Sequence, residues 1–563
     1  MKSKNYSFFQ NDINRKLIWL IIIYCCAHFL LLFISGQWWD DWCYMTQGGI
    51  EHLKTGYLES GIPLQAYNIL SVMWLPNWGY RIVVFFLFLA IGLLFFLILR
   101  SLDFITDEDA FWISAVAMLV PVNDARVVLN CYGYSICLTT FMLGFFVITK
   151  MVNCTGKKRI ILRIISYVCL LHSYTTESLL VFTGIIWIYL FYISYLKSKG
   201  EKPRNKVLLF FKSNWDYLVL PFLYYIFKQI YFKPYGAYAG YNTITIDLLI
   251  ENTLGSPLTA INTFIRICMT YKYQIDIISI IVLFLFIILY LIIQKKKNSV
   301  EEIKKIQIKK HILFFVLGVI VYYAGLFAYI VIRGNSLLNE GVDGRDSMLA
   351  GFGIAIMFVA ASRCIPIKKC LQNLIPIFFI VLGTFYFNNA YLNYQEDWYH
   401  QQQFANSIEQ YHGFNNDNTI LCDFSDSSPI NGTRFYSLNG NSYIQTGKMD
   451  KFYFCSINDL SIGLNFNNAF LNGYNADEYD PSDMTIDGVL IINNPPISNK
   501  EILRIRFDEL FLPEVYEQDI KKLSDIQYIR ISKEFSNRLY DLYTSKTLTS
   551  SILRKELSEY YTN

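Results

Sequence analysis

Two adjacent carboxylates, Asp40 and Asp41, stand directly after the first long apolar stretch of the chain. Three tryptophans, Trp38, Trp39 and Trp42, surround them. An indole prefers the membrane–water interface, where its ring stays in an apolar layer and its N–H stays hydrated. Paired carboxylates at such a place can act as a general base, or can bind a cation or substrate hydroxyl groups. The alternative is that they only mark the solvated end of a helix, because charged residues flank most membrane spans.

The stretch before this motif, residues 17–34, predicts a membrane span. The composition agrees, since 54% of the 563 residues are hydrophobic and 17% are charged, which is typical of a chain whose main solvent is lipid. The stretch is too long for the apolar core of a signal peptide, and no small-residue cleavage site follows it. We therefore expect it to remain as an anchor. The net charge of +4 gives no indication of nucleic acid, and we expect no nucleic-acid partner.

Further apolar runs predict about eleven membrane spans in total. Clear runs cover residues 82–99, 136–148, 179–196, 215–232, 275–293, 312–332, 348–361 and 371–387. Two others, 111–122 and 160–171, fall short of the roughly 20 helical residues that cross a bilayer. They must be extended by neighbouring polar residues or be broken helices that line a cavity. Residues 36–80, the first outer loop, predict one or two short helices in the interface.

Lysine and arginine alternate between the loops and so predict the orientation. Four cations precede the first span, and residues 150–163, 197–212 and 295–310 are also basic, whereas the loops between them carry few cations. The alternation holds only if both short runs are counted as spans. We therefore expect a multi-pass protein of the cytoplasmic membrane with its N-terminus in the cytoplasm. An odd number of spans places the residues after 390 on the extracytoplasmic side.

The C-terminal part, residues 391–563, differs in composition and predicts a separate domain. It is polar and rich in Asn, Asp, Ser and Tyr. Residues 418–424 and 488–492 are typical of buried strands, residues 527–531 predict a third strand, and residues 500–507 predict a helix. The predicted fold is therefore an all-α polytopic membrane domain over residues 1–390, followed by a small extracytoplasmic α/β domain over residues 391–563.

This topology places several charged or polar residues on the outer side together with the aspartate pair. They are Arg126, His172, Glu177, Arg333, Arg345 and Asp346. Each one alone also fits the flank of a span. Glu177 and Arg345 adjoin apolar helices, where a charge is costly and is usually retained for a function. The forked donors of arginine suit a phosphate. We predict that a base, a polar orienting group and an anion clamp converge on one outward cavity.

The chain shows no P-loop and no glycine-rich nucleotide fingerprint. The cysteines are scattered without zinc-ligand spacing, so no metal site is predicted. We expect no cofactor, although the sequence leaves a requirement for a divalent cation open. A soluble nucleotide sugar therefore has no evident binding place on the cytoplasmic side, and the outer side is the predicted working side.

Three short motifs resemble positions in the membrane glycosyltransferases of the GT-C fold. They are Trp39-Asp40-Asp41-Trp42 after the first span, Tyr174-Thr175-Thr176-Glu177, and Gly344-Arg345-Asp346. The resemblance also covers the architecture of residues 1–400. It implies a polyprenyl-phosphate-linked sugar donor, a glycan or lipid acceptor, and transfer at the outer bilayer surface. It further implies that an aspartate of the first outer loop is the general base, with Asp40 and Asp41 both open. The arginines would steady the departing phosphate, with inversion at the anomeric carbon.

Three other functions remain open. A flippase or transporter of lipid-linked oligosaccharides predicts repeats and midplane charges, and we see neither in the sequence. An oligosaccharide polymerase or ligase would depend on arginines in large outer loops more than on an acidic pair. A structural or sensory membrane protein would carry its function in the C-terminal domain.

Overall fold

The computed structural model forms two compact units. It describes residues 12–45, 49–76, 78–198, 202–240, 246–271, 305–332, 341–365, 369–410, 419–424, 435–446, 451–454, 486–493, 496–522, 525–544 and 550–562. The first unit, here the helical unit, comprises residues 1–32, 57–127 and 131–390. The second, here the α/β unit, comprises residues 33–56, 128–130 and 391–563. The α/β unit therefore includes part of the predicted first outer loop.

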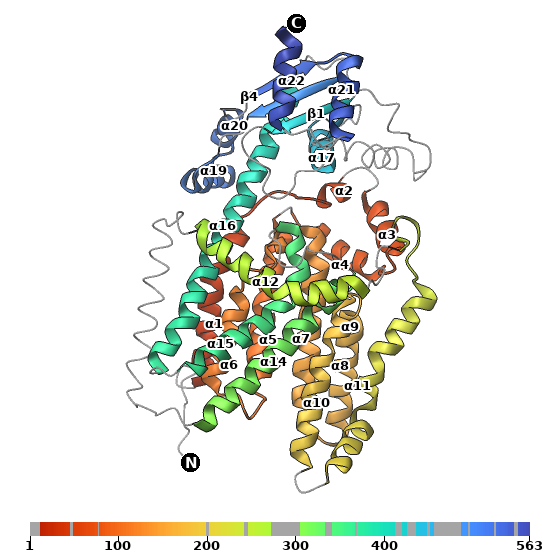
Figure 1. The fold of residues 1–563 in the computed structure, drawn as a ribbon, viewed down its shortest axis with the longest axis vertical. Helices are drawn as coiled ribbons and strands as arrows, with labels where there is room; N and C mark the ends of the chain where they lie inside the picture. The colour runs from red at the N-terminus through yellow and green to blue at the C-terminus, as the bar shows by residue number, and fades with distance from the viewer. Residues whose placement is uncertain are drawn as a thin grey trace. The chain divides into compact units, whose positions relative to one another are not determined.

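Helices build the helical unit (Figure 1). They are α1 (Asp12–His28), η2 (Phe29–Leu32), α4 (Leu64–Met73), α5 (Gly79–Leu99), α6 (Asp107–Leu119), η3 (Asp124–Val127), α7 (Tyr132–Met151), α8 (Gly156–Ser173), α9 (Ser178–Phe182), α10 (Gly184–Lys197), α11 (Pro203–Tyr231), η5 (Gly236–Tyr238), α12 (Ile246–Tyr271), α14 (Lys305–Ile330), η6 (Gly341–Ser347) and α15 (Ala350–Cys364). Two further helices, η4 (Leu129–Cys131) and α16 (Lys369–Gln410), are divided between the two units. Many of these helices coincide with predicted apolar runs, whereas α12 and η5 do not. Residues 111–119 of the first short run lie in α6, which ends at Leu119, and the second short run, 160–171, lies in α8. The predicted span 275–293 lies outside the described residues.

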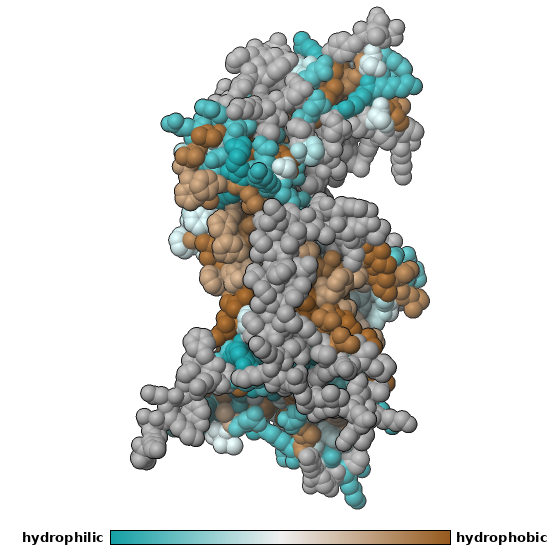
Figure 2. Space-filling view, turned by 90° about the vertical axis from the view of Figure 1, so that its left-hand side faces the viewer, coloured by the Kyte–Doolittle hydropathy of each residue, from teal (hydrophilic) through white to brown (hydrophobic). Residues whose placement is uncertain are grey.

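Six helical stretches of the described chain are long and apolar enough to cross a membrane. They are Asp12–Leu32, Gly79–Leu99, Leu129–Met151, Ser178–Lys197, Lys309–Ile330 and Leu371–Asn406. Ala350–Cys364 is apolar but shorter. Figure 2 shows hydrophobic residues gathered at mid-height on the coloured surface, while hydrophilic residues are commoner toward the lower end. A hydrophobic outer surface is expected where lipid replaces water as the solvent.

Small residues let the helices of this unit approach closely. A Cβ atom at Gly353 of α15 would collide with the backbone of Tyr322 in α14. On the same pair of helices, a Cβ at Gly325 would lie 2.7 Å from the carbonyl carbon of Leu349. Apolar burial drives helix association only weakly in lipid, so close van der Waals packing at small residues carries more of the stability.

A four-stranded sheet with the order β2-β1-β3-β4 forms the centre of the α/β unit (Figure 1). The strands are β1 (Thr419–Phe424), β2 (Phe452–Phe454), β3 (Gly488–Asn493) and β4 (Asp525–Arg530). Strand β1 is parallel to β2 and β3, whereas β4 is antiparallel to β3. The helices of this unit are α2 (Asp41–Met45), α17 (Phe435–Thr446), α19 (Asn499–Phe511), α20 (Pro513–Lys522), α21 (Lys533–Thr544) and α22 (Ser550–Thr562); α3 (Gly49–Glu59) is divided between the units.

Side chains that alternate along the strands bury both faces of the sheet. Leu421 points to a core that includes Phe535 of α21 and Leu553 of α22. Its neighbour Ile420 points to a second core that includes Phe404 of α16 and Leu438 of α17. Successive side chains of a strand face opposite sides, so a sheet covered by helices on both faces needs apolar residues at consecutive positions. This requirement explains the continuous apolar strands of the sequence.

Candidate functional site

Asp41 is fully buried, and its carboxylate holds a backbone turn. The backbone N–H of Leu129 donates to Oδ2 and that of Asn130 donates to Oδ1, both at 2.9 Å. A buried carboxylate is costly unless hydrogen bonds compensate for the lost water, and bonds to an ionised acceptor are among the stronger ones. The geometry of Asp41 is therefore that of a structural anchor between α2 and residues 128–130.

Asp40 is half-buried and is held by a side chain instead. Its Oδ2 accepts a hydrogen bond from Nδ2 of Asn130 at 3.1 Å. The hydroxyl of Tyr44 donates to Oδ1 of the same amide at 2.9 Å, which fixes the amide with its N–H side toward Asp40. A general base needs a defined orientation together with access to the group that it deprotonates. Asp40 combines an orienting partner with partial exposure.

The residue before Asp40 has an unusual backbone conformation. Trp39 has φ of 55°, in the left-handed region that bulky side chains rarely adopt. Such a conformation costs on the order of 1–3 kcal/mol and persists only where the surroundings enforce it. Among the described residues, one other non-glycine has a positive φ, Asn123 at 61°, three positions before Arg126. Backbone strain clusters at functional sites, so both positions support the candidate residues beside them.

Cys43 lies one helical turn after Asp40 and is buried in the sheet core. Burial, and then the carboxylates of Asp40 and Asp41, raise the pKa of its thiol well above the ordinary value. The thiolate is the nucleophilic form of cysteine, so a thiol that stays protonated at neutral pH is unreactive. Cys43 is therefore part of the packing around the aspartate pair.

Arg126, in the helical unit, is a buried arginine enclosed by aromatic rings. Its guanidinium carbon lies 4.2 Å from the ring centre of Phe88 and 4.6 Å from that of Phe387. Its Nε donates to the carbonyl of Asn123 at 2.8 Å. Within the part of the chain that the structure describes, Arg126 forms no ion pair. A buried cation that lacks a carboxylate partner inside a membrane protein is a candidate anion site.

The turn that carries Arg126 packs against the turn that carries Arg345, because η3 and η6 are neighbours. Arg345 and Asp346 are both buried, and Nε of the arginine lies 3.7 Å from Oδ1 of the aspartate. Tyr329 of α14 lies within electrostatic range of both and beside Ser178, the first residue of α9. Three segments that the sequence analysis assigned to the outer side therefore meet within the helical unit.

A small cavity lies beside Arg126. Its lining includes Arg126, Asn123, Phe88, Met118, Met348 and Phe352, and its volume is about 30 Å³. That volume accommodates one water molecule and is too small for a phosphate group. An anion could reach Arg126 here only if neighbouring side chains moved.

His172, at the end of α8, bridges two other helices. One ring nitrogen, Nδ1, is 3.0 Å from the hydroxyl of Thr140 in α7, and Nε2 is 3.2 Å from Oδ1 of Asn68 in α4. Gln65 of α4 extends this network by donating to the hydroxyl of Thr175 at 3.1 Å. Both ring nitrogens are engaged, so His172 joins α4 to the helix bundle. The prediction that it contacts substrate remains a prediction.

Glu177 has a partner that the sequence analysis did not assign. It forms an ion pair with Lys228 of α11, whose side chain is only 4% exposed. The pair fixes the start of α9 to α11 and gives Glu177 a structural explanation alongside the predicted functional one. Arg333, another predicted substrate-binding residue, lies outside the described residues.

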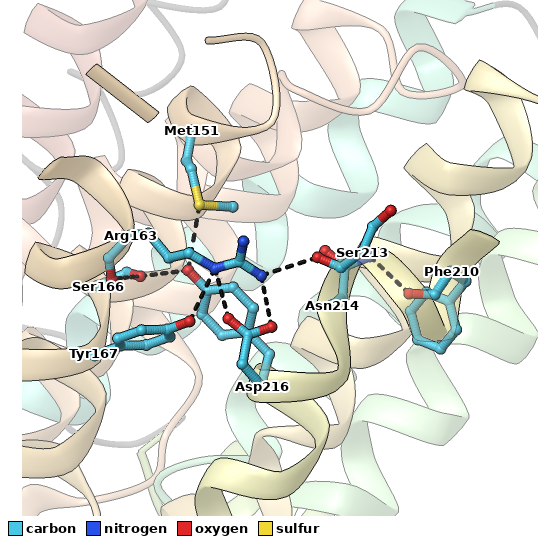
Figure 3. Close-up of polar contacts among 9 residues, drawn as sticks. Met151, Arg163, Ser166, Tyr167, Phe210, Ser213, Asn214 and Asp216 are labelled. Atoms are coloured by element: carbon cyan, nitrogen blue, oxygen red, sulfur yellow. Dashed lines mark hydrogen bonds and ion pairs between the residues drawn. The ribbon is translucent and has the colours of Figure 1, made fainter. Parts of the chain in front are cut away.

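A second ion pair between helices has no counterpart in the predicted site. In Figure 3, two guanidinium nitrogens of Arg163 in α8 donate to the carboxylate of Asp216 in α11, each at 2.5 Å from one oxygen. The same guanidinium donates to the hydroxyl of Tyr167 and the carbonyl of Ser213, both at 2.9 Å. Non-helical backbone angles at Asn214 mark a kink in α11 beside this pair. The cluster is fully engaged in protein contacts, so we interpret it as a clamp for the kinked helix.

The arrangement offers two chemical capabilities, one in each unit. Asp40 can accept a proton, and Arg126 can bind an anion. Among the described residues, no three of His, Cys, Asp and Glu are grouped so as to hold a metal ion. Comparison of the chain with protein-family models, curated proteins and solved structures finds no match.

Proposed function

We propose that the protein is an integral-membrane glycosyltransferase of GT-C-like architecture. It moves a sugar from a polyprenyl-phosphate-linked donor to a cell-envelope glycan, lipid or polymer acceptor at the outer face of the cytoplasmic membrane. The observation that carries this proposal is the half-buried carboxylate of Asp40, held by Asn130 and Tyr44 beside the strained Trp39. It sits eight residues beyond Leu32, where the first candidate span ends.

Asp40 accepts the proton of the acceptor hydroxyl as that oxygen attacks the anomeric carbon. The bond between the anomeric carbon and the phosphate oxygen breaks, and the polyprenyl phosphate leaves with the bonding electron pair. Attack opposite the leaving group inverts the configuration. Asp40 suits this role better than Asp41, because both carboxylate oxygens of Asp41 already accept backbone N–H groups.

Among the arginines that the sequence analysis singled out, Arg126 of the helical unit has the surroundings that best suit an anion. It is buried and forms no ion pair among the described residues, whereas Arg345 lies beside Asp346. A guanidinium stabilises the charge that develops on a departing phosphate, and it does so more strongly where water is excluded.

Radiolabelled polyprenyl-phosphate sugars test the proposal directly. Full-length protein in lipid nanodiscs is incubated with hexose and pentose donors, and transfer or hydrolysis is measured by separating free sugar from lipid. A nucleotide sugar serves as the control donor. The Tyr44→Phe variant removes the hydroxyl that orients the Asn130 amide toward Asp40. We expect release from the lipid donors only, reduced in the Tyr44→Phe variant. Absence of release from every polyprenyl-phosphate sugar would contradict the proposal.

A further inference from the structure

An exposed apolar patch lies at the corner between α19 and α20 of the α/β unit. We define it by five side chains: Phe507 (56% exposed), Leu510 (45%), Phe511 (64%), Leu512 (47%) and Val515 (39%). The rings of Phe507 and Phe511 contact each other, with centres 4.7 Å apart. Single exposed apolar residues are normal, but a contiguous group of large ones indicates a surface that is covered in the working protein.

Helices α19 and α20 form a helical hairpin, and charged side chains of this hairpin pair with one another. Arg504 donates to Asp508 at 2.9 Å and to Asp519 of α20 at 2.8 Å, so it ties the two helices together. The hairpin therefore has a paired, charged part and an unpaired apolar corner. This division is typical of helices that lie in the interfacial plane of a bilayer.

Two hydrogen bonds attach α19 to the chain where it leaves the first candidate span. Arg506 donates to the backbone carbonyl of Phe33, and the hydroxyl of Ser35 donates to Glu509 at 3.1 Å. Phe33 follows directly on Leu32, the last residue of the span Asp12–Leu32. The hairpin is thus fixed to residues that stand one to three positions beyond the end of a membrane helix.

A second attachment is made to α16. The backbone N–H of Ile497, just before α19, donates to Glu396 at 2.7 Å, and the rings of Tyr399 and Tyr516 have centres 6.1 Å apart. Glu396 lies about 38 Å of helix beyond Leu371, where the last candidate span begins. That length exceeds the roughly 30 Å hydrocarbon core, so a helix that enters the core at Leu371 leaves it before Glu396.

We propose that the apolar patch of α19 and α20 lies in the headgroup layer of the bilayer, with Phe507 and Phe511 at the acyl boundary. Both attachments join the helices that carry the patch to residues that continue candidate spans along the chain, so the occupant that they favour is lipid. The inference does not depend on the catalytic proposal. It gives the α/β unit a membrane contact besides the spans that lead into it.

Fluorine NMR with paramagnetic lipids tests this placement. Phe511 is replaced by 4-trifluoromethylphenylalanine in the full-length protein, which is reconstituted in phosphatidylcholine–phosphatidylglycerol nanodiscs. The matched control carries the same residue in place of Lys555, on α22, whose side chain is 73% exposed. Relaxation is measured with a lipid spin-labelled near the headgroup and, separately, with a water-soluble gadolinium chelate.

We expect the lipid label to relax the fluorine at position 511 several-fold more than the fluorine at 555, and the chelate to do the reverse. Equal effects at the two positions would overturn the proposal, because they would place the patch in water. Protection of position 511 from both agents would also overturn it, because it would show that protein covers the patch. Repeating the measurement at Leu510 guards against a local effect of the first label.

Discussion

The two adjacent aspartates should differ sharply in what they contribute to stability. Asp41→Asn keeps one oxygen for one backbone N–H but turns an amide N–H₂ toward the other, so a buried donor is left without an acceptor. The structure places both N–H groups at 2.9 Å from the carboxylate of a fully buried residue. Losing a hydrogen bond to a charged group costs about 1.5–3 kcal/mol, and we expect a loss of about 3 kcal/mol for this variant.

Asp40→Asn provides the internal control, because the amide oxygen can still accept from Asn130 at a half-exposed position. We expect it to cost less than about 1 kcal/mol. For a unit of roughly this size, 1 kcal/mol shifts the melting temperature by about 2–4 °C. The α/β unit should therefore melt about 6–12 °C lower in Asp41→Asn than in the wild type.

The assay heats purified full-length protein in detergent and measures the folded fraction by fluorescence-detected size exclusion. A comparable decrease in melting temperature for both variants would refute the assignment of different roles. So would a larger decrease for Asp40→Asn, because it would make Asp40 the structural member of the pair.

Further variants test predicted contacts by the same melting assay. Gly133→Ala places a Cβ against Oε1 of Gln65 and should cost about 1–3 kcal/mol, whereas Gly56→Ala, with no atom within 4 Å of its new Cβ, should be neutral or slightly stabilising. Equal melting of these two variants would contradict the predicted contact. Glu177→Gln leaves the buried Lys228 without its ion-pair partner and should cost about 1–3 kcal/mol, less than for a fully buried pair because Glu177 is 33% exposed. Adding Lys228→Met should restore part of the loss, and a double variant that melts below the single one would count against the pair.

Local features of the sequence predict most of the helices, and non-local contacts explain what it misses. Hydropathy is a local property, so the apolar runs coincide with helices such as α5 and α14 in the described chain. The strand predictions at 418–424 and 488–492 coincide with β1 and β3 for the same reason. Strand β2 has only three residues, Phe452–Phe454, and depends on pairing with β1, so no periodicity could reveal it.

The same limit applies to the candidate site. The sequence singles out Asp40 and Asp41 but cannot separate them, because the difference lies in Leu129 and Asn130, nearly ninety residues further along the chain. It likewise finds Glu177 but not Lys228. A charge beside an apolar helix, such as Glu177, is visible in the sequence. The residue that pairs with it is determined by the fold. The meeting of η3 and η6 agrees with the predicted grouping of Arg126, Arg345 and Asp346, although their role in binding a donor remains a prediction.

The central claim is that Asp40 removes the proton of the acceptor. The most direct measurement compares the rate of sugar transfer by wild-type protein and by Asp40→Asn at equal amounts of folded protein and saturating donor. A general base contributes about 10²- to 10⁴-fold, so the variant should be slower by about that factor while its KM for the donor stays close to the wild-type value. A rate for Asp40→Asn equal to that of the wild type would contradict the claim.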